Sequence, residues 1–131
     1  MAKIKLLIDT DIFIDALQGI TPAKDLFKTK NIELYCSILT KKELLSKQGL
    51  SDSERRQIIN LISKIRVLKI DGDIQRKYSM LLKKYGEKPE SIVDYIIAAT
   101  ACAKRLPLLT RNRKHFEHIN EITLSPVYKI E

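Results

Sequence analysis

The stretch IKLLIDTDIFI, residues 4–14, decides the fold. Its first five residues form a short apolar run with the length and composition of a buried strand. Asp9, Thr10 and Asp11 follow at once, and the apolar run IFI then opens a helix-like pattern. Acidic side chains therefore stand at the carboxyl end of a strand. Ligands bind at this edge of open α/β sheets, so we expect a functional site there.

Strand and helix patterns alternate along the rest of the chain. We predict strands at 4–9, 32–37, 66–70, 107–110 and 126–130, and helices at 12–18, 22–29, 40–48, 52–64, 72–85 and 90–104. Such alternation is typical of a central, mostly parallel sheet of four to five strands flanked by helices. The 131 residues fit one domain, so we expect a single α/β domain over residues 1–131.

Four polar side chains fall where predicted strands end or predicted helices begin: Asp9, Glu43, Asp94 and Asn112. Parallel strands bring their carboxyl ends to one edge, so Asp9, Glu43 and Asn112 are expected to share it. Asp94 can face them from a helix amino terminus. Because carboxylate and amide oxygens are the ligands that Mg²⁺ prefers, the pattern predicts a metal-binding cluster.

Helix capping is the competing interpretation of two of these acids. The segments 40–43, 51–54 and 91–94 all fit the capping-box pattern, in which an acid at the third helical position closes the helix start. Asp94, however, shares a helix face with apolar residues at i+3, i+4 and i+7, so we expect its side chain to point toward the core. A buried carboxylate needs a counter-charge, and a metal ion would supply it.

The composition indicates which kind of partner and which cellular compartment to expect. The 24 Lys and Arg against 16 Asp and Glu leave a net charge of +8, which favours a polyanionic partner, although ordinary solvated lysines remain an alternative. Cys36 and Cys102 lie in apolar surroundings without metal-ligand spacing, so we expect buried thiols. No signal peptide or membrane-spanning run is evident, and we expect a cytoplasmic protein with no membrane partner.

Four segments together resemble the PIN-domain family, and specifically the VapC-type toxins of toxin–antitoxin pairs. They are LIDTDIFID at 7–15, SILTKKEL at 37–44, DYIIAATA at 94–101 and LLTRNRKHF at 108–116. The resemblance implies an endoribonuclease dependent on Mg²⁺ or Mn²⁺, acting on structured RNA such as tRNA or rRNA. It also implies a small cognate antitoxin and a homodimer.

By the same resemblance, Asp9, Glu43 and Asp94 match the family's three acidic positions, and Asn112 matches a fourth that carries Asp or Asn. The uncharged Asn112 favours one tightly held ion. We expect Asp9 and Asp94 to ligate it directly, and Glu43 to ligate through water or to orient the attacking water. The implied products carry a 5′-phosphate and a 3′-hydroxyl.

Neighbouring polar residues have weaker assignments. Thr10 and Thr110 could bind a ligand or stabilise turns. Asp11 could ligate the ion, but capping of the first helix is the favoured role, and Asp15 stays outside the core set. Arg111, Arg113 and Lys114 form the candidate RNA contact beside Asn112. His115 and His118 are expected at the surface or in packing roles, and Phe116 in the core.

Two other readings stay open. Haloacid-dehalogenase-like phosphatases also carry Asp-x-Asp after a first strand, but Ile12 and Phe13 follow here and no adjacent acidic pair occurs downstream. A catalytically silent PIN-like module that binds RNA or protein is the second. A basic side chain filling the acidic site would favour it, whereas a bound metal ion would favour catalysis.

Overall fold

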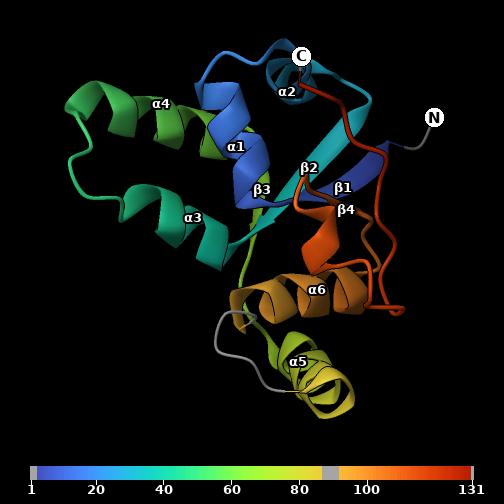
Figure 1. Cartoon of the computed structure of the whole chain (residues 1–131). Coiled ribbons are helices and arrows are strands. Elements are labelled where there is room, and N and C mark those ends of the chain that lie inside the picture. Colours follow the sequence, from blue (N-terminus) through green and yellow to red (C-terminus); the bar gives the residue numbers. More distant parts are fainter. Residues whose placement is uncertain (1–2, 87–91, 131) are drawn as a thin grey trace.

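A parallel four-stranded sheet in the order β3-β2-β1-β4 runs through the centre of the protein (Figure 1). The strands are β1 (Ile4–Ile8), β2 (Ile32–Ser37), β3 (Arg66–Leu68) and β4 (Leu108–Leu109). The structure, a computed structural model, describes residues 3–86 and 92–130. The predicted parallel α/β architecture is confirmed.

Helices cover both faces of the sheet. They are α1 (Thr10–Leu17), α2 (Thr21–Lys28), α3 (Ile38–Leu45), α4 (Asp52–Ser63), α5 (Gly72–Tyr85) and α6 (Ile92–Lys104), followed by the short 3-10 helix η2 (Arg113–His115). Figure 1 shows α5 and α6 together on the opposite side of the sheet from α1, α3 and α4. None of the helices within the described ranges has the length and apolar character needed to cross a membrane.

The alternation of side chains along β1 builds two cores. Leu6 and Ile8 pack with α1, α3 and α4, whereas Leu7 packs with α5 and α6. Leu108 and Leu109 divide in the same way between the two faces. Strands buried on both faces read as continuous apolar runs, which is why the sequence of β1 shows no polar alternation at its end.

The strand register places the start of the site. Ile8 pairs with Leu109, and the backbone N–H of Asp9 donates to the Leu109 carbonyl at 3.1 Å. Asp9 and Thr110 therefore leave the sheet side by side, although they are 101 positions apart in the chain. This is the convergence at the strand ends that the sequence predicts.

The predicted strand at 126–130 is wrong. Residue Leu124 forms only an isolated bridge with Leu108, and the chain beyond it has no strand within the described residues. Pro126 has no N–H to offer a ladder, and Val127 and Tyr128 instead pack on the core beneath α1. Residues 125–130 therefore form an irregular segment packed on the core, which we call the carboxyl-terminal strap, and not a fifth strand.

Two predicted helix starts also need revision. Asp9, and not Asp11, caps α1, which therefore begins at Thr10. Ser37 caps α3, so Thr40 lies inside the helix and the predicted capping box at 40–43 is wrong. The capping box at 51–54 is confirmed, and the one at 91–94 depends on residue 91, which lies outside the described residues.

The two cysteines differ. Cys36 is buried as predicted, and burial raises the pKa of its thiol to about 12. Cys102 is only partly buried, which corrects the expectation of a buried thiol, because it lies off the face of α6 that packs on the core. Both thiols are unbonded.

Candidate functional site

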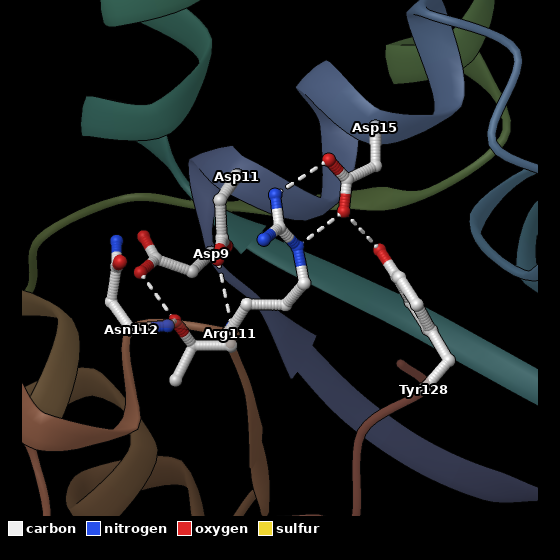
Figure 2. A network of polar contacts seen from close by, with 7 residues as sticks. Asp9, Asp11, Asp15, Arg111, Asn112 and Tyr128 are labelled. Carbon is white, nitrogen blue, oxygen red and sulfur yellow. Dashed lines mark hydrogen bonds and ion pairs between the residues drawn. The ribbon is translucent and has the colours of Figure 1, made fainter. Parts of the chain in front are cut away.

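Asp9 stands at the centre of the candidate site. Its Oδ1 accepts from the Thr10 backbone N–H at 2.8 Å, and its Oδ2 accepts from the Thr110 hydroxyl at 2.9 Å (Figure 2). Burial, and next the negative charge of Asp11, raise the pKa of Asp9 to about 6. Two neutral donors therefore hold the carboxylate in place, and no Lys or Arg within residues 3–86 and 92–130 forms an ion pair with it.

Glu43 reaches the site from α3. Its Oε2 accepts from the Thr10 hydroxyl at 2.7 Å, and this hydroxyl also lies 3.4 Å from that of Thr40. Because Ser37 caps α3, Glu43 lies inside the helix and does not cap it. Thr10, expected as an accessory residue, orients Glu43 toward the end of β1.

Asp94 faces the site from the first turn of α6. Its side chain is 25% exposed, and its Oδ2 lies 3.1 Å from Nδ1 of His115. The Asp94 side chain is thus largely buried, in agreement with the expectation from the sequence, and its carboxylate contacts His115. Burial raises the pKa of Asp94, although His115 opposes this effect.

His115 is a site residue that the sequence analysis placed at the surface or in packing. It lies in η2, where its backbone N–H donates to the Asn112 carbonyl at 3.1 Å. A single 3-10 turn therefore carries the chain from Asn112 to the partner of Asp94. The signal available in the sequence was the spacing of three residues between Asn112 and His115.

Asn112 lies in the loop after β4. Its backbone N–H donates to the Thr110 hydroxyl at 3.1 Å, so Thr110 links Asn112 to Asp9. In Figure 2 the Asn112 side chain lies beside the Asp9 carboxylate. Thr110 is fully buried, which suits an orienting hydroxyl better than a contact with substrate.

Arg111 is exposed, but its guanidinium is tied to an acidic residue of α1. Its Nε and Nη2 donate to the two oxygens of Asp15 at 2.6 and 2.8 Å, and its backbone N–H donates to Oδ2 of Asp11 at 2.7 Å (Figure 2). The Asp15 side chain is 3% exposed. The Arg111 side chain is itself 38% exposed, so its predicted contact with RNA stays a prediction.

The other two basic residues of the segment differ in their exposure. Arg113 donates through Nη1 to the Ser125 carbonyl at 2.7 Å, and Lys114 is exposed. Phe116, which follows, is fully buried, as predicted. His118 stacks edge-on against Tyr85 at 5.2 Å between ring centroids, which is the packing role expected for it.

The three predicted metal ligands are neighbours but not a closed cage. Within residues 3–86 and 92–130, no three His, Cys, Asp or Glu side chains are arranged to hold an ion. Asp9, Glu43 and Asp94 each have a separate partner, and like charges without a cation between them favour such separation. The acids still influence one another, because Asp94 contributes to the raised pKa of Asp9, and Glu43 to that of Asp94.

The chemistry of the donors fits a divalent cation. The carboxylate and amide side chains of the site offer oxygen ligands, which suit Mg²⁺ and Mn²⁺. Oδ1 of Asp11 is buried and has no hydrogen-bond partner, next to a carboxylate whose pKa is already raised. Unbalanced, desolvated negative charge of this kind is what a bound cation would neutralise.

Comparison with known proteins agrees with this geometry. Residues 6–122 match the family model described as PIN domain. Ribonuclease VapC10 of Mycobacterium tuberculosis is 31% identical over 121 residues, covering 89% of this chain and 90% of the relative. Ribonuclease VapC1 of Methanocaldococcus jannaschii is 32% identical over 128 residues, covering 92% and 85%.

Solved structures show the same fold. A toxin–antitoxin complex from Klebsiella pneumoniae contains a chain that superposes with a TM-score of 0.76 at 30% identity, covering 95% of this chain and 99% of that one. VapBC2 from Rickettsia felis, bound to a promoter DNA fragment, gives a TM-score of 0.75 at 21% identity, with 93% and 98% covered.

Proposed function

Since this chain belongs to the PIN-domain family, with VapC ribonucleases as relatives, we propose that it is an Mg²⁺- or Mn²⁺-dependent endoribonuclease toxin that cleaves structured RNA, such as tRNA or rRNA. The observation that carries the proposal is the meeting of Asp9, Glu43 and Asp94, from three separate elements, at the carboxyl edge of the sheet. The family match leaves no support for the phosphatase reading.

Asp9 and Asp94 are the proposed direct ligands. A bound ion would lower the pKa of a coordinated water and offset charge on the scissile phosphate. Glu43, held by Thr10 at 2.7 Å, would orient the attacking water. Asn112 brings no charge, so it would orient substrate or water, and we favour a single tightly held ion. The products would carry a 5′-phosphate and a 3′-hydroxyl.

RNA would approach over η2 and the loop before it. Lys114 is exposed there, and Arg113 is only partly buried. Basic side chains beside an acidic site would hold the phosphates that flank the scissile bond. We therefore propose Arg111, Arg113 and Lys114 as the RNA contacts.

A groove of about 530 Å³ next to the site supports an antitoxin partner. Its lining residues include Thr10, Ile14, Leu17, Glu43, Leu50 and Ile58. An amphipathic segment could bury its apolar face there and place a basic side chain on Glu43. We also propose a homodimer and a cytoplasmic location, where cellular RNA substrates are present.

If the protein were a catalytically silent module that only binds RNA or protein, we would expect a basic side chain to neutralise the acidic site. In the described part of the chain, no Lys or Arg forms an ion pair with Asp9, Glu43 or Asp94. Catalysis is therefore the function that the geometry favours.

The test is cleavage of a total small-RNA pool by the purified protein, with Mg²⁺ or Mn²⁺ or with chelator. We expect discrete, metal-dependent products that Asp94→Asn does not form. Asp25→Asn, which changes an exposed aspartate of α2, is the matched control and should cleave normally. Equal cleavage by Asp94→Asn would overturn the assignment of this residue, and no cleavage by wild type would favour the silent module.

A further inference from the structure

An ion pair between a buried carboxylate and a half-exposed guanidinium ties the loop after β4 to helix α1. Asp15 is 2% exposed, and both of its oxygens accept from the guanidinium of Arg111, which is 96 positions away in the chain. The hydroxyl of Tyr128 donates to Oδ2 of the same carboxylate at 2.7 Å (Figure 2). Burial alone would raise the pKa of Asp15, but these donors together hold it below its usual range.

The same loop contacts the start of α1 at two further points. The Arg111 backbone N–H donates to Asp11, and the Thr110 hydroxyl donates to Asp9. The Asn112 N–H then donates to Thr110. The three consecutive residues 110–112 are therefore fixed to one face of α1, with the guanidinium of Arg111 as the strongest of these attachments because it is bidentate and ionic.

We infer that Arg111 is the positioning residue of the site, which holds Thr110 and Asn112 against Asp9, and that Asp15 and Tyr128 act through it. The inference rests on the proposed function only in taking Asp9 as part of the catalytic centre. It assigns a role to Asp15, which the sequence analysis left out, and a different role to Arg111.

A substitution can separate positioning from RNA binding, because the Arg111 side chain is 38% exposed and could serve both roles. Two of the guanidinium donors of Arg111 are committed to Asp15, whose side chain is out of reach of a large polyanion at 3% exposure. A phosphate contact needs positive charge, which Lys also supplies. A bidentate clamp needs the planar fork of Arg, which Lys lacks. Arg111→Lys therefore distinguishes the two roles.

Tyr128 brings the carboxyl-terminal strap into the same unit. Val127 and Tyr128 pack against the core shared with α1, and Ser125 accepts from Arg113 at 2.7 Å. The strap thus holds both basic residues that flank Asn112. Tyr128 acts on Arg111 through Asp15, and Ser125 binds Arg113 directly. Loosening the strap is expected to loosen the loop, without touching any proposed metal ligand.

The first experiment measures kcat, KM and the salt dependence of RNA cleavage for Arg111→Lys. We expect kcat to fall at least about tenfold, as misplacement of a catalytic group does, with KM within about twofold and the salt slope unchanged. Lys114→Met provides the contrast, with a raised KM and a shallower salt slope. Wild-type kcat in Arg111→Lys would overturn the inference.

Tyr128→Phe removes one hydrogen bond from Asp15 and keeps the packing of the ring. Its loss of kcat should be smaller than that of Arg111→Lys, and the double variant should lose no more than Arg111→Lys alone, because both act through one unit. Tyr78→Phe, which removes a hydroxyl on α5, is the matched control. Additive losses would mean that Tyr128 does not act through Arg111.

Amide hydrogen exchange, without RNA or metal, tests the positioning apart from activity. Exchange in residues 110–112 should be faster in Arg111→Lys and Tyr128→Phe than in wild type, and unchanged in Tyr78→Phe. Unchanged exchange in Arg111→Lys would refute the positioning role even if kcat fell. If wild type cleaved no RNA, the proposed function would fail while this exchange result still decided the positioning.

Discussion

Asp9 and Asp15 belong to the same short segment, and burial acts to raise the pKa of both, but their net shifts are opposite. Asp9 has two neutral donors, and its pKa is raised to about 6. Asp15 is more deeply buried, yet its pKa is lowered because a guanidinium and a phenol donate to it. The partner, and not the depth, decides the direction in which the pKa of each carboxylate moves.

Asp9→Asn should stabilise the apo protein at neutral pH. The raised pKa means that the folded state binds a proton more tightly than the unfolded chain, so this group's stabilisation is full below about pH 4 and is lost as pH rises through about 6. Removing the charge should recover up to about 3 kcal/mol at pH 7.5, since Asn can still cap α1. Urea unfolding at pH 5 and pH 7.5 checks this.

The matched control for this stability measurement is Asp25→Asn. Its free energy of unfolding should equal that of wild type at both pH values, because Asp25 is exposed. A loss of stability in Asp9→Asn at pH 7.5, relative to wild type, would contradict the picture of Asp9 as an unbalanced buried charge.

Asp15→Ala should destabilise the protein by about 2–3 kcal/mol, because it leaves the Arg111 guanidinium partly buried without its carboxylate. The lowered pKa of Asp15 gives the opposite pH dependence from Asp9: its contribution is present above about pH 4 and is lost as pH falls further. Thermal unfolding between pH 3 and pH 7 measures both effects. A variant as stable as wild type would show that the ion pair contributes nothing net.

The sequence allowed Asp9, Glu43, Asp94 and Asn112 to be selected because each stands at a strand end or a helix start. It did not reveal the partner of any of them. Pairings such as Tyr128 with Asp15, 113 positions apart, follow from how the last segment packs, and no local pattern encodes them. Asp15 could have been predicted as buried, because it lies beside the buried Ala16 on an apolar helix.

At the scale of elements, the site depends on where helices begin. Ser37 accepts from the Leu39 N–H at 3.2 Å and starts α3 directly at the end of β2. The capping-box pattern at 40–43 suggested a later start, because Thr and Glu at that spacing satisfy the same rule without regard to strand length. The earlier start turns Glu43 toward Thr10.

Ser37→Ala should therefore weaken α3. We expect a loss of about 1 kcal/mol in the free energy of unfolding, the usual cost of an N-cap hydroxyl. Thr40→Val keeps the shape of the side chain inside the helix and serves as the comparison, with no capping loss. Urea denaturation distinguishes them, and equal stability of Ser37→Ala and wild type would contradict the capping assignment.

The strap after β4 shows the limit of element prediction. A run of apolar residues near the chain end reads as a strand, yet β4 has only two residues and Pro126 cannot donate to it. Tertiary packing under α1 decided the outcome. A strand is defined by backbone hydrogen bonds to a neighbouring strand, and the strap is not. Hydrophobic patterning does not report these hydrogen bonds, so it cannot distinguish the two.

At the scale of the whole molecule, a basic protein carries an acidic site. The net charge of +8 attracts RNA, and the carboxylates at the sheet edge would repel its phosphates unless a cation intervened. The overall fold could be predicted because apolar strands that alternate with helices leave little choice other than a parallel sheet between helices.

RNA affinity should fall steeply with salt. Raising monovalent salt from about 50 to about 200 mM should weaken binding at least about tenfold if several phosphates are contacted. Filter binding with Asp94→Asn, which should bind without cleaving, measures this. A salt-independent affinity would contradict an electrostatic approach over the basic surface.

The most direct test compares Mn²⁺ binding by calorimetry with the Mn²⁺ dependence of single-turnover RNA cleavage. The site described here predicts about one ion per chain, with half-saturation of cleavage at the concentration that half-fills the site. Asp9→Asn should lose both, and Asp25→Asn neither. Full cleavage in chelator, or cleavage retained by Asp9→Asn, would contradict a metal-dependent ribonuclease centred on these carboxylates.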